Sequence, residues 1–473
     1  LPPCPDYFII FLATASIGAI WVGLNPKYSR HELMHPVADS EPTLVLARTL
    51  IDGRNYLSDL EAVCAQKGRD ISIVAIDGEV DAERILSWKA FIEGGKSVSS
   101  SELTKRQAET VHTDPCLIVY TSGTTGKPKG ATLTHHGLIY CSCTDAKYNL
   151  GLKAQRMLCN FPINHIACVG DVCCTTLIVG GTLVFMEQFD PKGILRTIER
   201  HGITHLGQIP VMLHATFSHP DVELFDLSSL QYITWGGNPA STDLVKRLRD
   251  YVPNLCNVYG MTETTGNVLF IRGDGFDDET FATCIGWPPE EYEVSLRDES
   301  GHPTKQGDVG EICVRGQFLM QGYWNNPEAT EATFHDDGWM RTGDLASQRL
   351  DGAFCISGRR SEMYKSGGYN IYPAEIEQAL ETLVGIEMAV VIGVPDAVYS
   401  EVGHAFLICD TVEQDIGLIK DHCRSLLANY KIPKKFHLIE GFPLLPNGKV
   451  DKAALRIAAK KDAEVSFLVN CGN

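Results

Sequence analysis

The sequence predicts an α/β fold: a large N-terminal region of several α/β subdomains, one of them β-rich, followed by a small α+β domain. Up to about residue 350, short β-branched runs alternate with helix-like stretches, which indicates layered sheets with much parallel pairing. From Ile285 onward the strands become shorter and Gly-rich turns more frequent. The 473 residues suffice for more than one domain and a large core. We therefore expect an N-terminal domain over residues 1–357 and a C-terminal domain over residues 358–473.

The first element is an uncharged stretch of 18 residues, Tyr7–Leu24, which is long enough to resemble a membrane span. It contains Gly18 and lacks basic flanks, so we expect a buried helix ending at Gly18 and a buried strand over Ala19–Val22. We predict no transmembrane span and leave peripheral membrane contact open. The chain begins at Leu1, so a targeting peptide would lie outside this sequence, and a cytoplasmic location is the expectation.

The next elements follow from hydrophobic periodicity. Four apolar runs are expected to be strands: Ser72–Ala75, Thr182–Phe185, His205–Ile209 and Tyr232–Trp235. Pro191–His201 places Ile194, Leu195 and Ile198 on one face, as in an amphipathic crossover helix. Later segments predict strands at Val294–Leu296, Glu311–Val314 and Ala389–Gly393, and helices at Ala374–Leu383 and Lys452–Lys461.

Charge and cysteine content exclude some functions. The formal net charge of −18 argues against a general nucleic-acid binder, which needs a basic face. The sixteen cysteines show no paired C-x-x-C spacing, so we expect them to be mostly reduced and predict no zinc site. Cys173-Cys174, Cys141 and Cys143 are expected to fill space as small apolar residues.

The most informative segment is Tyr120–Gly130 (YTSGTTGKPKG), a loop of small residues that exposes backbone N–H groups and hydroxyls. The run Cys116–Tyr120 before it reads as a buried strand. Lys127 and Lys129 add positive charge, so the loop is suited to hold polyphosphate. It is not a Walker A loop, because Thr121 and Pro128 occupy positions where that motif needs Gly and Ser or Thr.

Further motifs follow downstream in a fixed order: Tyr259–Thr264 (YGMTET), Thr342–Asp344 (TGD), Gly358–Gly368 (GRRSEMYKSGG), Asn370–Glu377 and Pro446–Lys449 (PNGK). With the loop at Tyr120 they make the chain resemble the adenylate-forming superfamily of acyl-CoA synthetases, adenylation domains and luciferases. The resemblance covers nearly the whole chain. It implies a carboxylate attack on the α-phosphate of ATP, followed by capture of the acyl-adenylate by a thiol, with ATP, Mg2+ and coenzyme A as cofactors.

The resemblance also implies roles for single residues in the first step. The phosphates of ATP would be held by Thr121, Ser122, Gly123, Thr124, Thr125 and Lys127, and the α-phosphate by Thr262. Glu263 would ligate Mg2+, which takes few carboxylates and keeps waters. Asp344 would accept hydrogen bonds from the ribose hydroxyls, and Arg359 would reach ribose or phosphate. Adenine would lie near Gly236, Gly237, Asn238, Pro239, Asn257, Val258, Tyr259 and Gly260.

The C-terminal domain would be mobile and serve both steps. Lys449 would bridge the carboxylate and the α-phosphate, then move away so that Gly368 can line the thiol tunnel. The hinge position is Ser361, where the superfamily more often has Asp or Lys, and this departure bears on domain rotation. Lys431, Lys434 and Lys435 would contact CoA phosphates or form a solvated charged face.

The sequence restricts the acid substrate less sharply. His165 occupies the position of an acyl-pocket residue in the superfamily. Amino-acid-activating domains of the superfamily carry a Phe-Asp pair just after this position, but the segment His165–Asp171 lacks it, and Asp171 is too isolated to replace it. Ile166, Val211 and Trp235 are compatible with an uncharged acyl or aryl group. The chain length of the acid and the oligomeric state of the protein are not readable.

Alternative functions remain at this stage. The first is an adenylation domain that loads a carrier protein, and the second is a truncated, non-catalytic binder of acyl or nucleotide ligands. The second arises because the chain opens inside what looks like the superfamily's first subdomain. A luciferase-like oxygenase would need a specialised substrate. An AMP-forming carboxylate–CoA ligase is the leading interpretation.

Overall fold

The computed structural model describes residues 1–65, 71–77, 85–121, 127–149, 151, 153–273, 275–396, 398–409, 416–445 and 449–460. Ser122, Gly123, Thr124 and Thr125 of the expected phosphate loop lie outside these ranges, as does the segment 446–448. The chain divides into two compact units. The first contains residues 1–207, 260–268 and 316–334, and the second contains residues 208–259, 269–315 and 335–473. The domain boundary at residue 357 stays a prediction.

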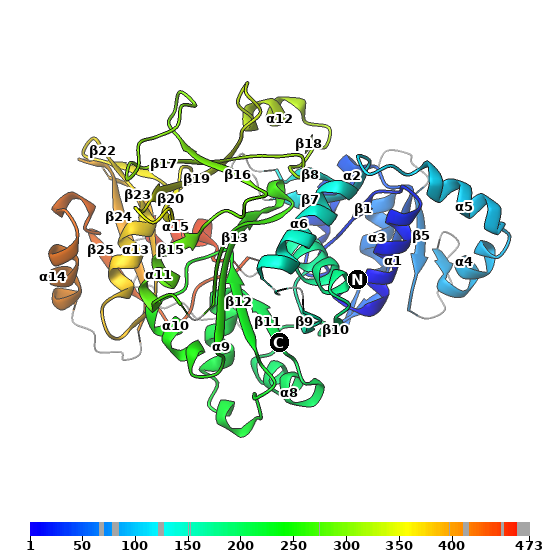
Figure 1. Cartoon of the computed structure of the whole chain (residues 1–473), viewed down its shortest axis with the longest axis horizontal. Helices are drawn as coiled ribbons and strands as arrows, with labels where there is room; N and C mark the ends of the chain where they lie inside the picture. Colours follow the sequence, from blue (N-terminus) through cyan, green and yellow to red (C-terminus); the bar gives the residue numbers. More distant parts are fainter. Residues whose placement is uncertain are drawn as a thin grey trace. The chain divides into compact units, whose positions relative to one another are not determined.

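The first unit contains parallel sheets, as predicted (Figure 1). One sheet has the order β2 (Leu44–Ala47), β5 (Ser72–Ala75) and β6 (Ile85–Ser87), all parallel. In another, β10 (Thr182–Phe185) and β11 (His205–Gln208) pair in parallel with β9 (Arg156–Cys159). A third has the order β1 (Trp21–Val22), β7 (Pro115–Thr121), β8 (Lys129–Thr134) and β18 (Gly322–Tyr323). The short strands β3 (Leu50–Ile51) and β4 (Arg54–Asn55) form a hairpin.

The described helices of the first unit are α1 (Pro5–Ser16), α2 (Arg30–Ser40), α3 (Leu57–Cys64), α4 (Trp88–Gly95), α5 (Ser100–Glu109), α6 (His135–Tyr148), the π-helix η2 (Ala167–Cys174), α7 (Thr175–Ile178), α8 (Pro191–His201), the short 3-10 helix η4 (Thr262–Thr264) and α12 (Pro327–Thr333). The helix expected to end at Gly18 ends two residues earlier, and the strand expected over Ala19–Val22 is limited to Trp21–Val22. No helix among the described residues is long and apolar enough to cross a membrane.

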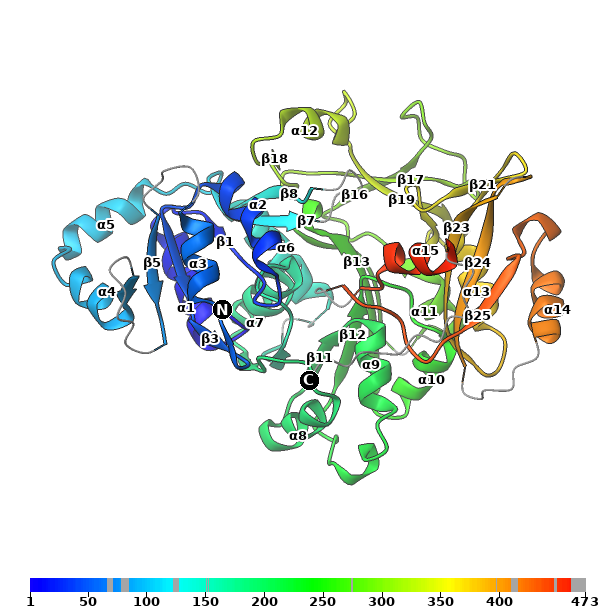
Figure 2. The same ribbon diagram turned by 180° about the vertical axis from the view of Figure 1, so that it is seen from behind.

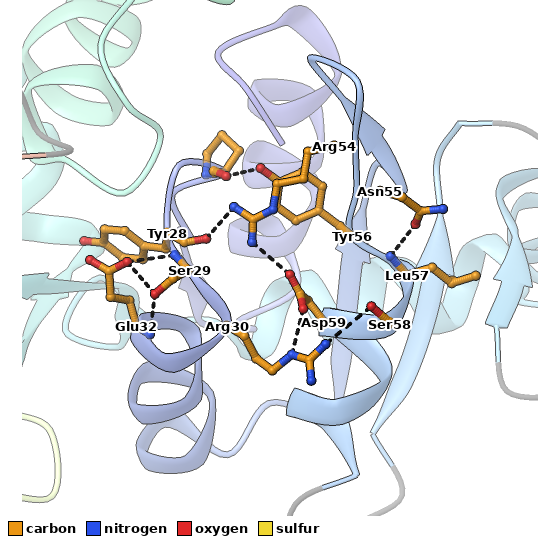
Figure 3. Close-up of polar contacts among 11 residues, drawn as sticks. Tyr28, Ser29, Arg30, Glu32, Arg54, Asn55, Tyr56, Leu57, Ser58 and Asp59 are labelled. Carbon is orange, nitrogen blue, oxygen red and sulfur yellow. Dashed lines mark hydrogen bonds and ion pairs between the residues drawn. The ribbon is translucent and has the colours of Figure 1, made fainter. Parts of the chain in front are cut away.

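An ion-pair network joins α2 to α3 at the surface of the first unit (Figure 3). Asp59 on α3 accepts from Arg30 on α2 at 2.7 Å and from Arg54 on β4 at 2.8 Å. Arg54 also donates to the carbonyl of Tyr28 at 3.0 Å. The hydrogen bond from Arg54, followed by that from Arg30, lowers the pKa of Asp59. Because both arginine side chains are largely exposed, the network fixes the helix geometry more than it stabilises the fold.

The second unit begins with α/β structure and continues into a β-rich part. Strand β12 (Tyr232–Gly236) pairs in parallel with β13 (Asn254–Met261), which precedes β14 (Gly266–Gly273). An antiparallel sheet follows with the order β15 (Cys284–Gly286), β20 (Phe354–Arg359), β19 (Met340–Gln348), β17 (Gly310–Arg315) and β16 (Glu293–Arg297). The described helices here are α9 (Pro210–Phe217), the 3-10 helix η3 (Val222–Leu224), α10 (Thr242–Arg249) and α11 (Asp278–Thr283).

The last part of the second unit is a mixed sheet covered by helices on both faces (Figures 1 and 2). The strand order is β22 (Tyr369–Ile371), β21 (Tyr364–Ser366), β24 (Ser400–Cys409) and β23 (Ile386–Asp396), with β25 (Lys435–Leu438) also paired to β24. Helices α13 (Pro373–Glu381) and α14 (Ile416–Leu426) pack on one face. Helix α15 (Lys452–Lys460) packs on the other, and the 3-10 helix η5 covers Asn429–Lys431. These elements confirm the predicted α+β character.

The cysteines are mostly free, with one exception. Thirteen described cysteines take part in no disulfide, whereas Cys284 and Cys355 form one. These two residues face each other across the antiparallel pair of β15 and β20, a proximity that sequence spacing does not reveal. Cys143 is exposed, so the expectation that it fills space inside the protein is wrong, while Cys141, Cys173 and Cys174 are buried.

A substitution in helix α8 tests the packing of the first unit. It begins with Pro191 at its first turn and ends at Gly202 in the left-handed region, and Ile198 is fully buried. We expect Ile198→Ala to destabilise the first unit by about 2–5 kcal/mol, because it leaves a cavity in the core. Urea unfolding followed by circular dichroism measures this. Arg196→Ala on the exposed face of α8 should change stability by less than about 0.5 kcal/mol, and equal effects of the two substitutions would contradict this packing.

Candidate active site

The predicted phosphate loop connects two neighbouring antiparallel strands. Thr121 at the end of β7 pairs with Lys129 at the start of β8, and Tyr120 pairs with Gly130. A Cβ atom at Gly130 would lie 2.8 Å from the side chain of Ile118, so a larger residue here would force that side chain to shift. Lys127 is exposed at the end of the loop. The strand expected before the loop is confirmed.

Glu263 of the Tyr259–Thr264 motif contacts Thr121 of the phosphate loop. Glu263 lies in η4, is 5% exposed, and its Oε1 accepts hydrogen bonds from the Thr121 hydroxyl at 3.3 Å and the Tyr323 hydroxyl at 2.9 Å. Among the described residues, Oε2 of Glu263 takes part in no hydrogen bond. A carboxylate oxygen is the donor type that Mg2+ prefers, so Glu263 fits the predicted metal. Thr262, immediately before it, is also buried.

Tyr323 is a residue of this cluster that the motifs did not reveal. Its hydroxyl donates to Glu263, and Nζ of Lys129 lies 4.4 Å from the centre of its ring. Burial and the neighbouring Glu263 raise the pKa of Tyr323, so the hydroxyl keeps its proton and acts as a donor. A tyrosine about 60 residues from its glutamate in sequence carries no recognisable spacing, so only the fold could show this contact.

A second buried carboxylate, Asp344, lies in the β-rich part of the second unit. It stands opposite Arg359 across β19 and β20, and Oδ1 contacts Nε of Arg359 at 2.8 Å. Oδ2 accepts from the Tyr259 hydroxyl at 2.8 Å, and burial with the charge of Asp344 raises the pKa of Tyr259. The structure thus brings together three residues that the resemblance assigns to the nucleotide.

Glu311 on β17 supports this carboxylate and was not predicted either. Oε1 of Glu311 accepts from the backbone N–H of Gly343, next to Asp344, at 3.0 Å. Oε2 pairs with Arg341 at 3.2 Å and with Arg360 at 3.1 Å. Glu311 therefore holds the part of β19 that precedes Asp344 and the residue that follows Arg359.

The segments expected near adenine follow β12 and form β13. Gly237 is exposed with a positive φ of 82°, and Asn238 and Pro239 come directly after it. Asn257 is buried, and its amide donates to the carbonyls of Phe281 and Cys284 at 3.2 and 2.9 Å. This amide therefore ties β13 to α11 and β15. Gly260 is required by packing, because a Cβ there would lie 2.1 Å from the carbonyl oxygen of Gly266.

His165 lies two residues before η2 begins. Its Nδ1 accepts from the backbone N–H of Ala167 at 3.2 Å, so Nε2 carries the proton when the ring is neutral. Ile166 is buried beside it, and Val211 is partly exposed in the second unit. Trp235 is only 1% exposed and packs against Phe281, which is typical of a core residue.

The C-terminal residues occupy turns and surface positions of the second unit. Gly367 and Gly368 form the two-residue turn between β21 and β22, with φ of 56° and 88°, as a type I′ turn requires. Ser361 is exposed, and Lys449 accepts a backbone hydrogen bond from Leu445 at 2.7 Å. Lys431 pairs with Glu375 at 2.5 Å, and Lys434 lies over the ring of Tyr399.

Comparison with known proteins assigns the family. The AMP-binding enzyme family matches residues 1–324, and the AMP-binding enzyme C-terminal domain matches residues 375–449. Feruloyl-CoA synthase of Amycolatopsis sp is 35% identical over 96% of this chain and 87% of that protein. Indoleacetate–CoA ligase of Aromatoleum aromaticum is 30% identical over 97% of this chain and 87% of that protein.

A solved structure supports the same conclusion. The o-succinylbenzoate CoA synthetase of Bacillus subtilis, in complex with its acyl-adenylate intermediate, matches with a TM-score of 0.76 and 27% identity, covering 98% of this chain and 87% of that one. The resemblance drawn from the motifs is confirmed by these matches. Two family models in the expected order and relatives over almost the whole length show that the chain belongs to the AMP-binding enzymes.

Proposed function

We propose that the protein uses ATP to convert a carboxylic acid with an uncharged acyl or aryl group into an acyl-adenylate and pyrophosphate, and then transfers the acyl group to coenzyme A. The observation that carries the proposal is the contact between Thr121 and Glu263, which joins the phosphate loop to the second motif. The relatives support it, since they include a feruloyl-CoA synthase and an indoleacetate–CoA ligase. The acids in both of these names carry an aromatic ring, and we favour a fatty or aryl acid here.

In the first half-reaction, a carboxylate oxygen attacks the α-phosphorus of ATP and the bond to the β-phosphate breaks, so pyrophosphate leaves. The anions repel each other, and the site must supply donors and cations around them. Lys127 and the loop hydroxyls would hold the departing phosphates, Thr262 the α-phosphate, and Asp344 the ribose. Mg2+ held by Glu263 would offset the negative charge of the phosphates.

In the second half-reaction, the thiol sulfur of coenzyme A attacks the acyl carbon and AMP leaves, while the thiol proton passes to solvent. We propose that the C-terminal domain, from residue 358 onward, rotates between the two steps. The rotation would begin at the exposed Ser361, just after β20 ends at Arg359. Lys449 would leave the reacting carboxyl in this motion, and Gly368 would line the thiol path.

A panel of carboxylic acids, scored for AMP release with and without coenzyme A, tests the proposal. Acid-dependent AMP release that needs coenzyme A for sustained turnover supports it. Turnover only with a carrier protein would indicate a carrier-loading adenylation domain. An absence of acid-dependent exchange between ATP and pyrophosphate would indicate a non-catalytic binder.

Tyr323→Phe tests the role of the tyrosine that contacts Glu263. The substitution removes the hydroxyl donor but keeps the ring next to Lys129, so Glu263 is less well oriented. We expect acid-dependent ATP–pyrophosphate exchange to fall by about tenfold, the scale of one hydrogen bond to a charged group. The Mg2+ concentration for half-maximal exchange should rise.

Tyr251→Phe is the matched control for Tyr323→Phe. It also removes a tyrosine–glutamate hydrogen bond of 2.9 Å, here to Glu223, but at an exposed position away from the motifs. Its exchange rate and Mg2+ dependence should stay those of the unmodified protein. A similar loss in both variants would argue that Tyr323 only stabilises the fold.

Lys449→Ala separates the two half-reactions. Without the ammonium group the negative charge that develops during adenylation is not offset, so acyl-adenylate formation should fall by roughly 10²-fold or more. The rate of acyl transfer to coenzyme A from a supplied acyl-adenylate should stay within about threefold of that of the unmodified protein, since a substitution away from the reacting groups usually has an effect no larger than this. Lys246→Ala, an exposed lysine on α10, should alter neither rate. Equal losses of both half-reactions in Lys449→Ala would refute this role.

A further inference from the structure

Three buried cysteines of the first unit converge on one point. Cys159 ends β9, whereas Cys168 and Cys173 lie on η2. The Sγ atom of Cys159 is 3.6 Å from that of Cys168 and 3.7 Å from that of Cys173, and all three sulfurs lie within 4.8 Å of one another. Each of the three residues is 0% exposed. Sequence spacing gave no sign of this cluster, because its members come from different elements.

The backbone of η2 is what aligns two of these sulfurs. Cys168 and Cys173 are five residues apart, and in an α-helix residues at this spacing point in different directions. The segment Ala167–Cys174 is instead a π-helix, whose wider turn brings residues five apart to one face. π-helical turns are rare and frequently occur at functional sites, so the cluster coincides with an independent local irregularity.

Tyr7 of α1 supplies a fourth donor atom at the same point. Its hydroxyl oxygen lies 3.0 Å from Sγ of Cys168 and 3.2 Å from Sγ of Cys173, and the residue is 0% exposed.

The distances between the sulfur atoms fit a tetrahedral metal ion bound by sulfur. With zinc–sulfur bonds of about 2.3 Å, the sulfurs of a tetrahedral site are about 3.8 Å apart. The observed separations of 3.6 and 3.7 Å from Cys159 come close to that value. A divalent ion also neutralises two of the three thiolate charges, whereas a monovalent ion would neutralise only one in a fully buried place.

We propose that Cys159, Cys168 and Cys173 bind a structural zinc ion, with the Tyr7 oxygen as the fourth ligand. Each thiol that coordinates the metal loses its proton to solvent, and the metal replaces hydrogen bonds between weak sulfur donors with coordinate bonds. The ion would join α1 to β9 and η2, which lie about 160 residues further along the chain. It would stabilise the first unit and take no part in the reaction.

Metal analysis of the purified full-length chain tests the proposal. We expect one zinc ion per chain after expression with zinc, and X-ray absorption at the zinc edge should show three sulfur neighbours and one oxygen. Removal of the metal with a strong chelator should lower the melting temperature, and added zinc should restore it. Binding of copper(I) in preference to zinc, or a chain that contains no zinc under these conditions, would overturn the assignment.

Variants provide the second arm of the test. Cys168→Ser should lose zinc, whereas Cys174→Ser, the buried cysteine next to Cys173, should retain it. Tyr7→Phe should retain zinc with weaker affinity. Zinc in Cys168→Ser at the level of the unmodified chain would overturn the proposal. If Cys168→Ser does not fold, cobalt(II) added to the chelated, unmodified chain decides instead, since only a thiolate site gives intense sulfur-to-cobalt absorption.

Discussion

The carboxylate of Glu263 is held inside the first unit by two hydroxyl groups, and that of Asp344 inside the second unit by a hydroxyl and a guanidinium. A buried carboxylate is costly unless it is hydrogen-bonded. In both units a tyrosine kept neutral by burial meets part of this requirement. Each unit must therefore place these hydroxyl and guanidinium donors beside its carboxylate, because an unpaired buried charge would destabilise it. In the second unit Glu311 helps by accepting from the backbone N–H of Gly343, next to Asp344.

Much of this arrangement could be predicted from local sequence. Pro191–His201 and Ser72–Ala75 form the expected elements with the expected bounds, because hydrophobic periodicity and terminal Pro and Gly residues act within a few positions. The motifs identified the family and the segments that carry Glu263 and Asp344. The contact of Tyr323 with Glu263 and the disulfide of Cys284 with Cys355 could not be predicted, because the spacing of the partners along the chain follows no recognisable pattern.

Some residues serve packing as well as the role that the motifs assign to them. Gly367 and Gly368 satisfy a two-residue hairpin turn, Gly260 allows a close backbone approach, and the amide of Asn257 is used on two carbonyl groups. A loss of activity on substituting one of these residues would thus combine a folding effect with a binding effect. Tyr323 and Lys449 are more informative, because conservative or surface replacements leave the backbone unchanged.

The pair of Asp344 and Arg359 has a consequence for how a ribose would be held in the proposed site. Each oxygen of the Asp344 carboxylate has one protein partner, and a carboxylate oxygen can accept from a second donor. Two ribose hydroxyls would therefore bind without breaking the contacts to Tyr259 and Arg359. These contacts hold the carboxylate in one orientation before a nucleotide arrives, so less conformational entropy would be lost on binding.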